Sequence, residues 1–389
     1  MGFIKTYKKK NFQIELITSI MLIFATISAI IICNSPFSKI YHNIFNDVYI
    51  VNDFSLHMFI NDFLMSIFFL VAGLEIKREV LHGNLSTLKK ASFPIIAAIG
   101  GVVLPAIIYF IFNRNTSYLS GICIPVSTDI AFAVGVFYIF KNKLDPKLSV
   151  FLLSLAVVDD LISIICIGVI YSLNIKLPFL IIALIIFFLL IIANKIFNVQ
   201  SILYYLIAGL CLWYFIHLSG IHSTISGVLL AISIPSSGHS KISTLDRLLK
   251  ILTPINNLFI VPLFAFANTG IVLVYNIDIS SSYPLILGII IGLCVGKPLG
   301  IILFTYIGSL LHITEKPKNT SWVSLFIVSL LAGIGFTMSI FVTEIAFIHD
   351  LVLVDIAKLS ILVASIISVM STAVCIYLYS IYLKVFRIQ

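Results

Sequence analysis

Charged residues are scarce in this sequence: they make up 10% of its 389 residues, whereas 60% of the residues are hydrophobic. A soluble domain is about a quarter charged and about half apolar, so this composition excludes an ordinary soluble protein. Tryptophan is also rare, with two residues. The mean hydropathy of +1.16 indicates a chain that crosses a membrane several times.

Several chemical signatures are missing as well. None of the six cysteines forms a CxxC or another metal-ligand spacing, so we interpret them as small apolar residues. No Walker loop, metal motif or nucleophile elbow occurs, which argues against ATP-driven pumping. The net charge of +8 does not indicate nucleic-acid binding, because Lys and Arg are spread over short loops without a basic stripe. We therefore expect no cofactor.

Apolar stretches near the length of a spanning helix, about 20 residues, recur along the chain. They predict an all-α polytopic membrane protein, a single transmembrane domain (1–389) with twelve transmembrane helices. The predicted spans are 14–33, 59–80, 92–112, 121–140, 148–172, 178–196, 201–219, 222–235, 254–274, 284–311, 322–347 and 354–383. The eighth is short. The alternating stretch 47–51, in the external loop 34–58, is either a short hairpin or an interfacial loop, and 236–253 is the main internal loop.

The basic residues predict the orientation of these spans. With the N-terminus inside, nineteen of the 24 Lys and Arg residues fall on the cytoplasmic side, four fall outside, and Lys297 falls within a span. Cytoplasmic loops carry an excess of Lys and Arg. We therefore expect both termini in the cytoplasm.

The residues least compatible with a membrane interior are two adjacent aspartates, Asp159 and Asp160, in the middle of the fifth span. One charge at bilayer depth costs roughly 2.5–3.5 kcal/mol on insertion scales. Asp62, Asp129 and Lys297 also lie in spans. A single residue of this kind can be a structural salt bridge, but the set favours ion transport or proton relay.

The two adjacent acids cannot play identical parts. Neighbours on a helix point about 100° apart, so we expect one carboxylate to face water and the other to turn toward another span. Lys297 is the expected basic partner, because a buried lysine must be paired or neutral. Two close carboxylates titrate as a pair. An oxygen site that also accepts protons suits competition between H⁺ and a small cation such as Na⁺ or Li⁺.

Helix-breaking residues interrupt two spans. The fourth contains PVSTD at 125–129 and the eleventh contains GIG at 333–335. Singly, such residues are often only a kink or a helix contact. The two spans run in opposite directions in the predicted topology and lie in comparable triplets, spans 3–5 and 10–12, which is typical of inverted-repeat transporters. Asp129 would then neutralise facing helix N-termini, and Lys297 facing C-termini.

Seven motifs follow one another over nearly the whole chain: GLEIKRE (73–79), STDIAFA (127–133), AVVDDL (156–161), GIHSTISG (220–227), PLFAFAN (262–268), GKPLG (296–300) and LAGIGFTMS (331–339). Through them the chain resembles the NhaA-type sodium/proton antiporters. The resemblance implies inverted-topology repeats with two crossed, interrupted helices, spans 4 and 11. It also implies electrogenic, pH-regulated export of cytoplasmic Na⁺ or Li⁺ in exchange for external protons.

The resemblance also assigns roles to individual residues. Asp159 and Asp160 would take the cation and the protons, with Thr128 as a further oxygen ligand. Lys297 would pair with Asp159, and Asp129 would balance the helix ends. A pH-responsive cytoplasmic entrance would comprise Glu75, Arg78 and Glu79, with His222 linked to it. As a lone residue, His222 is equally a polar contact between helices, and segment 245–254 lacks the histidines that some members carry there.

Location and assembly follow from the same resemblance. The protein would lie in a bacterial inner membrane and serve sodium and pH homeostasis. Spans 3–5 and 10–12 would form the ion-binding core. Spans 1, 2, 8 and 9 and the 34–58 loop would form an interface part, and the chain would make a homodimer through the 34–58 loop. Neither nucleic acid nor ATP is an expected partner.

Two other classes stay open on the residues alone. A sodium-coupled symporter would need a polar, substrate-sized cavity, and the spans have no surplus of Asn, Gln or Arg to line one. An intramembrane aspartyl protease would need two facing aspartates on separate spans. Asp129 and Asp160 would be its pair, which leaves Lys297 without a role. We therefore expect an antiporter and not an enzyme.

Overall fold

Apolar segments form helices along most of this chain. The computed structural model describes residues 2–51, 54–83, 85–141, 143–172, 175–236, 243–272, 279–317 and 320–386. Within these ranges nine helices are long and apolar enough to cross a membrane, or eleven if each of two bent helix pairs counts as one span. The protein is thus an all-helical, multi-pass membrane protein. In the eighth predicted span the helix α10 covers only Ile225–Ser233, which is short of a full crossing.

The chain divides into two units, each described by itself. Unit 1 comprises Met1–Ile23, Asn84–Ser163 and Ile271–Gln389, and unit 2 comprises Phe24–Gly83 and Ile164–Gly270. Helices α1 (Gly2–Cys33) and α7 (Pro146–Ile170) contribute to both. The other elements of unit 1 are α5 (Leu88–Asn113), η2 (Ser117–Val126), α6 (Ile130–Ile139), α13 (Ile279–Ile291), η4 (Gly292–Gly296), α14 (Lys297–Leu310), α15 (Trp322–Ala332), α16 (Phe336–Ala346) and α17 (Leu351–Phe386). Those of unit 2 are α2 (Ser38–Asn46), β1 (Tyr49–Val51), β2 (Phe54–Ser55), α3 (Leu56–Met58), η1 (Phe59–Leu64), α4 (Met65–His82), α8 (Leu177–Lys195), α9 (Ile202–Ser219), α10, α11 (Thr244–Ile255), η3 (Asn256–Ile260) and α12 (Val261–Asn268).

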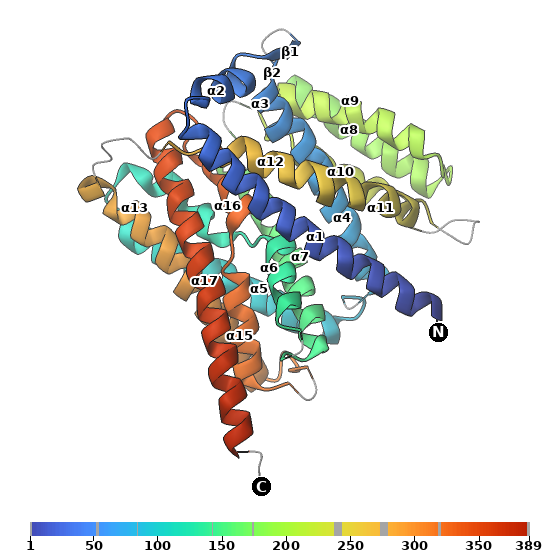
Figure 1. Ribbon diagram of the computed structural model, residues 1–389. Helices are drawn as coiled ribbons and strands as arrows, with labels where there is room; N and C mark the ends of the chain where they lie inside the picture. The colour runs from blue at the N-terminus through green and yellow to red at the C-terminus, as the bar shows by residue number, and fades with distance from the viewer. Residues whose placement is uncertain are drawn as a thin grey trace. The chain divides into compact units, whose positions relative to one another are not determined.

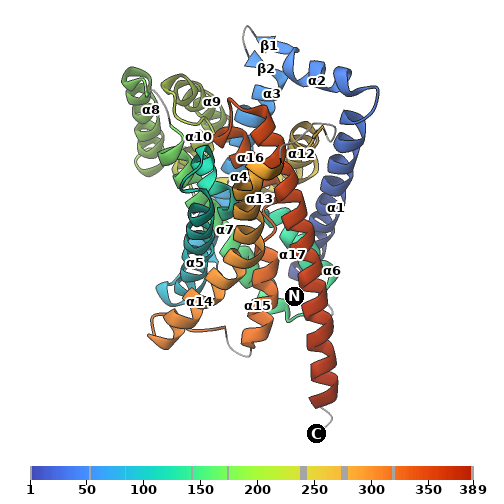
Figure 2. The same cartoon turned by 90° about the vertical axis from the view of Figure 1, so that its left-hand side faces the viewer.

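Two helices of unit 1, α5 and α14, are in direct backbone contact, and Figure 2 shows them side by side. A Cβ atom on Gly100 would lie 2.2 Å from the carbonyl oxygen of Gly300, and one on Gly300 would lie 2.1 Å from that of Gly100. Small residues permit this close approach in membranes, where helices associate by packing. Because α14 begins at Lys297, this contact positions the lysine within unit 1.

Unit 2 contains a similar contact between α4 and α10. A Cβ atom on Gly227 would lie 2.1 Å from the carbonyl oxygen of Ser66, and one on Gly73 would lie 2.7 Å from Ala231 Cβ. Helices α8 and α9 also lie side by side in Figures 1 and 2. Buried aliphatic residues of α4, α8, α9, α10 and α11 form one apolar cluster in this unit.

The structure corrects the start of the ninth span. Residues 244–255, which the sequence placed mainly in the internal loop, form the helix α11. Ser243 is its N-cap: its hydroxyl oxygen accepts a hydrogen bond from the Asp246 N–H at 3.1 Å. The buried leucines recur at helical spacing: Leu245, Leu248 and Leu249. A search for long apolar runs misses a half-polar helix of this kind. The helix is recognised by the periodic spacing of its apolar residues, and its mean hydropathy is low.

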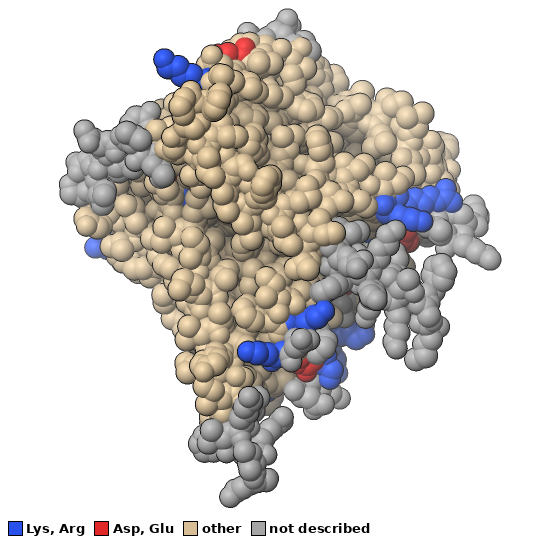
Figure 3. Space-filling model, viewed as in Figure 1, with Lys and Arg blue, Asp and Glu red and all other residues tan. Residues whose placement is uncertain are grey.

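The stretch 47–51 had two interpretations, and the hairpin is the correct one. Strand β1 pairs with β2 in antiparallel fashion, with Tyr49 opposite Ser55 and Val51 opposite Phe54. The surface is otherwise that of a membrane protein. Figure 3 shows a broad expanse without Lys, Arg, Asp or Glu, and many large apolar side chains are exposed. Lipid is the solvent in which such a surface is stable.

Candidate functional site

The site of interest in unit 1 is built on two interruptions of helix. Residues 127–129 separate η2 from α6, and residues 333–335 separate α15 from α16. Each pair of helices is bent by 45°. The N–H of Asp129 donates a hydrogen bond to the Ile334 carbonyl at 2.8 Å. The two interruptions therefore lie against each other, although they are about 200 positions apart in the sequence.

Asp129 is buried and serves as a cap for two helices. Its Oδ1 accepts a hydrogen bond from the Phe132 N–H at 2.9 Å, in the first turn of α6. Its Oδ2 accepts from the Thr337 N–H at 3.1 Å and from the Thr337 hydroxyl at 2.5 Å, in the first turn of α16. A helix N-terminus carries unsatisfied N–H groups and partial positive charge. One carboxylate thus satisfies donors at two such ends.

Lys297 interacts with the C-terminal end of η2, the helix that precedes the first interruption. Its Nζ donates to Asp159 Oδ2 at 2.7 Å, and each side chain is 1% exposed. It also donates to the carbonyl oxygen of Val126, the last residue of η2. A helix C-terminus carries partial negative charge. The lysine therefore meets one carboxylate and one helix end, where a buried ammonium group is stabilised.

The second C-terminal end has a different partner. The Thr128 hydroxyl lies 3.0 Å from the carbonyl oxygen of Ala332, the last residue of α15, and 2.6 Å from Asp159 Oδ2. Its one hydrogen can go to either acceptor. Lys297 contacts the end of η2 and makes no hydrogen bond to α15 within the described part of the chain. Lys297 was expected to neutralise both facing C-termini. It contacts the C-terminus of η2, whereas Thr128 contacts that of α15.

The two adjacent aspartates of α7 are both buried. Asp159 Oδ2 accepts from Lys297 and Thr128, while Asp159 Oδ1 has no hydrogen-bond partner in the described part of the chain. Asp160 lies close enough to Lys297 to act on it electrostatically. No cluster of three or more His, Cys, Asp or Glu side chains suited to a metal ion occurs among the described residues. A cation held by this acid pair would therefore need neutral oxygens as well.

The residues assigned to a cytoplasmic entrance lie on α4, in unit 2. Glu75, Arg78 and Glu79 occupy positions i, i+3 and i+4, which lie on one face of a helix. Each is partly buried, and both Arg78 and Glu79 act electrostatically on Glu75. The three form one charged cluster.

His222 is not part of that cluster. Its Nδ1 lies 3.1 Å from the Thr224 hydroxyl, and the titratable groups that act on it electrostatically include Asp62 and His217. His217 Nδ1 in turn lies 3.6 Å from Asp62 Oδ2. Asp62 precedes Glu75 by thirteen residues of helical chain, roughly 20 Å. The histidine and the Glu75 cluster therefore occupy separate parts of unit 2.

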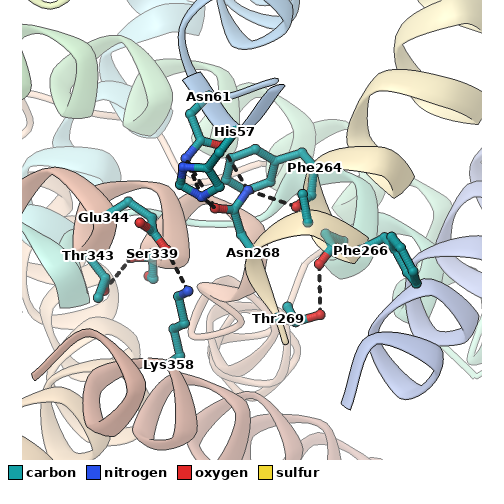
Figure 4. Close-up of polar contacts among 12 residues, drawn as sticks. His57, Asn61, Phe264, Phe266, Asn268, Thr269, Ser339, Thr343, Glu344 and Lys358 are labelled. Atoms are coloured by element: carbon teal, nitrogen blue, oxygen red, sulfur yellow. Dashed lines mark hydrogen bonds and ion pairs between the residues drawn. The ribbon is translucent and has the colours of Figure 1, made fainter. Parts of the chain in front are cut away.

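Two ionic groups were missed in the sequence. Lys77 donates to the carbonyls of Ala231 at 3.3 Å and Ile232 at 2.6 Å, and to that of Ile234, and so caps the C-terminal end of α10. In unit 1, Lys358 Nζ lies 2.5 Å from Glu344 Oε1, which joins α17 to α16 (Figure 4). The opposite charges near the external ends of two predicted spans, 322–347 and 354–383, were the available signal for the second group.

The motif PLFAFAN also acquires a structural meaning. Asn268, its last residue, exchanges two hydrogen bonds with Asn61 of η1, at 3.1 and 2.8 Å. His57 Nε2 lies 3.1 Å from the same Asn268 side chain (Figure 4). Side-chain amides paired in this way satisfy each other's hydrogen-bonding groups. The motif therefore ties α12 to η1 within unit 2.

Many apolar helices, together with buried acids and a lysine gathered at two helix interruptions, define an ion transporter of the membrane. The comparison with known families agrees. The family model described as "Na+/H+ antiporter 1" matches residues 9–376. The chain belongs to this family of Na⁺/H⁺ antiporters.

Individual relatives cover almost the full length. The Na(+)/H(+) antiporter NhaA 2 of Aliarcobacter butzleri (strain RM4018) is 41% identical over 380 residues, which cover 94% of this chain and 95% of its own. The Na(+)/H(+) antiporter NhaA of Helicobacter pylori (strain ATCC 700392 / 26695) is 41% identical, covering 92% of each chain. That of Pelagibacter ubique (strain HTCC1062) is 41% identical, covering 92% of this chain and 93% of its own.

Proposed function

We propose that this protein exports cytoplasmic Na⁺ or Li⁺ in exchange for external protons, at the inner membrane of a bacterium. The observation that carries the proposal is the buried group of Asp159, Asp160 and Lys297 beside two helix interruptions. Buried ionisable residues of this kind mark ion pathways and proton relays. Membership of the family supports the same pair of ions.

The acid pair would bind either a cation or protons. Asp159 Oδ2 is occupied by Lys297 and Thr128, so an incoming cation would first meet Asp159 Oδ1 and the Asp160 carboxylate, with Thr128 as a neutral ligand. Cation and ammonium group would then compete for Asp159, because both neutralise the same charge. Uptake of protons by the acids would release the cation. Alternation between these two occupants is what exchange requires.

The architecture we propose is that of inverted repeats. The interrupted spans 4 and 11 would cross at their breaks, within the triplets 3–5 and 10–12 of a twelve-span fold with cytoplasmic termini. The hydrogen bonds of Asp129 to both α6 and α16 support this arrangement. Spans 1, 2, 8 and 9 and the 34–58 loop would form an interface part, with a homodimer made through the 34–58 loop. The predicted orientation rests on the distribution of basic residues. Three of these lie outside the described residues: Lys241, Lys318 and Arg387.

Regulation by pH would belong to unit 2. The cluster of Glu75, Arg78 and Glu79 lies on α4 near its C-terminal end, which faces the cytoplasm in the predicted topology. His222 would contribute through Asp62 and His217 instead. The exchange would also be electrogenic, since more than one proton per Na⁺ allows the membrane potential to contribute about 2.3 kcal/mol per net charge and 100 mV.

The protease alternative is disfavoured by the state of Asp129. A catalytic aspartate must present an oxygen to substrate or water. Both oxygens of Asp129 are engaged by donors in the first turns of α6 and α16. An Asp129–Asp160 pair would have to break two helix caps in order to act.

Everted membrane vesicles with a pH-sensitive dye test the proposal. Addition of Na⁺ or Li⁺ should collapse an acid-inside proton gradient, whereas K⁺ should have little effect. Asp160→Asn should abolish the response. Asp145→Asn is the matched control, because Asp145 precedes the same helix and its Oδ1 bonds only the nearby Lys147 N–H among the described contacts. Normal exchange by Asp160→Asn would refute the site, and a response that required an added organic solute would indicate a symporter.

A further inference from the structure

Ser163 of α7 is a buried polar residue with no role in the site described so far. Its side chain is 2% exposed, and its hydroxyl has no hydrogen-bond partner within the described residues. Several buried serines elsewhere in the chain donate to a carbonyl three or four residues earlier, as Ser329 does to Phe326 at 2.7 Å and Ser360 to Ile356 at 2.8 Å. The Ser163 hydroxyl does not make this usual bond, although a buried hydroxyl is destabilising without a partner.

Helix geometry places this hydroxyl beside the acid pair. At 100° per residue, Asp160 lies 100° around the α7 axis from Asp159, and Ser163 lies about 40° from Asp159, between the two. It is also one turn further along the helix. Residues three and four positions apart have Cβ atoms about 5–6 Å from each other. The serine therefore shares a face of α7 with both carboxylates.

We propose that Ser163 is an additional ligand of the transported cation, and that it sets the preference between Na⁺ and Li⁺. This inference rests on the proposed function. The described residues offer the cation only two acids at this place, and hard cations complete their shell with neutral oxygens. A hydroxyl oxygen supplies one without adding charge, so the number of exchanged protons is unaffected. Li⁺ is the smaller ion and is satisfied by fewer oxygens, so Na⁺ gains more from this ligand.

Ser127 was the competing candidate, because its buried hydroxyl also has no partner among the described residues. It precedes Thr128 in an extended linker, with ψ of 148°. Successive side chains of extended backbone point to opposite sides. Since Thr128 points at Asp159, Ser127 points away, and the proposal is confined to Ser163.

The test compares Ser163→Ala with wild type in everted vesicles, with Na⁺ and Li⁺ titrated separately. Ser163→Ala should raise the Na⁺ concentration for half-maximal exchange by about fivefold, the equivalent of one lost neutral contact. The effect on Li⁺ should be smaller, and the maximal response should persist. Ser163→Thr keeps the hydroxyl and should restore the Na⁺ response. Ser154→Ala is the control, because Ser154 is a buried serine of α7 about 180° around the axis from Ser163.

The possible outcomes distinguish a failure of the Ser163 ligand role from a failure of the proposed antiport function. Unchanged half-maximal concentrations of both ions in Ser163→Ala would overturn the ligand role while leaving the antiporter intact. An equal loss of maximal response with both ions, at unchanged half-maximal concentrations, would also overturn it and indicate a packing role. If wild type itself fails to respond to Na⁺ and Li⁺, the proposed function falls, and this inference with it.

Discussion

The ion pair between Lys297 and Asp159 permits a quantitative test of how the site is held together. Both side chains are 1% exposed and 2.7 Å apart. Removing one partner of a buried pair leaves an uncompensated charge and typically costs about 3–5 kcal/mol. Lys297→Met and Asp159→Asn should therefore each lower the free energy of unfolding by about that amount.

The two single variants should not be equal. Lys297→Met leaves both Asp159 and Asp160 without their cation, and Val126 without its donor. Asp159→Asn leaves Lys297 with Asp160 and the Val126 carbonyl. We therefore expect the lysine variant to be the less stable of the two. The double variant should be more stable than Lys297→Met alone, because it contains one buried charge fewer.

Unfolding of purified protein in mixed detergent micelles, followed by circular dichroism, measures these free energies. The sum of the single effects would be about 6–10 kcal/mol if the residues were independent. A double variant that loses this full sum would show that the two charges do not depend on each other, and the reasoning above would be wrong. Lys250→Met is a suitable control, because Lys250 is an exposed lysine of α11 and should change stability by less than about 0.5 kcal/mol.

Three further predictions concern the scaffold. Gly300→Ala should force α5 away from α14, because its Cβ would lie 2.1 Å from the Gly100 carbonyl oxygen, and it should lower both thermal stability and exchange. Gly308→Ala, whose nearest contact would be 3.2 Å, should have a smaller effect. Equal effects of the two variants would contradict this reasoning. Asp129→Ala removes two helix caps and should lower the free energy of unfolding by about 1–4 kcal/mol, with Asp129→Asn closer to wild type; detergent unfolding distinguishes them. Lys77→Met should lower it by about 1.5–3 kcal/mol, because charged bonds to the end of α10 are lost; unchanged unfolding would show that water replaces the ammonium group there.

Much of this protein could be predicted from local sequence. Whether a segment crosses a membrane depends on its own apolar residues, so the class and most span positions followed from hydropathy. The interruptions at 127–129 and 333–335 could be predicted for the same reason, since proline, glycine and hydroxyl residues disfavour helix where they stand. The acid pair was conspicuous because charge is so unfavourable in lipid. Helix α11 was missed because it is only half apolar, and its N-cap at Ser243 was the available signal.

Which groups meet was decided by the tertiary structure. Lys297 and Asp159 are 138 positions apart, and Asp129 and Thr337 are 208 apart. The sequence suggested the first pairing by charge alone, and it offered no reason to join Thr128 to the end of α15 or Lys77 to the end of α10. His222 and the Glu75 cluster were expected to form one entrance. In the fold His222 lies near Asp62, thirteen residues of helix away from Glu75. A hydrogen bond needs its two atoms within about 3 Å, and only the packing of whole helices brings distant residues that close.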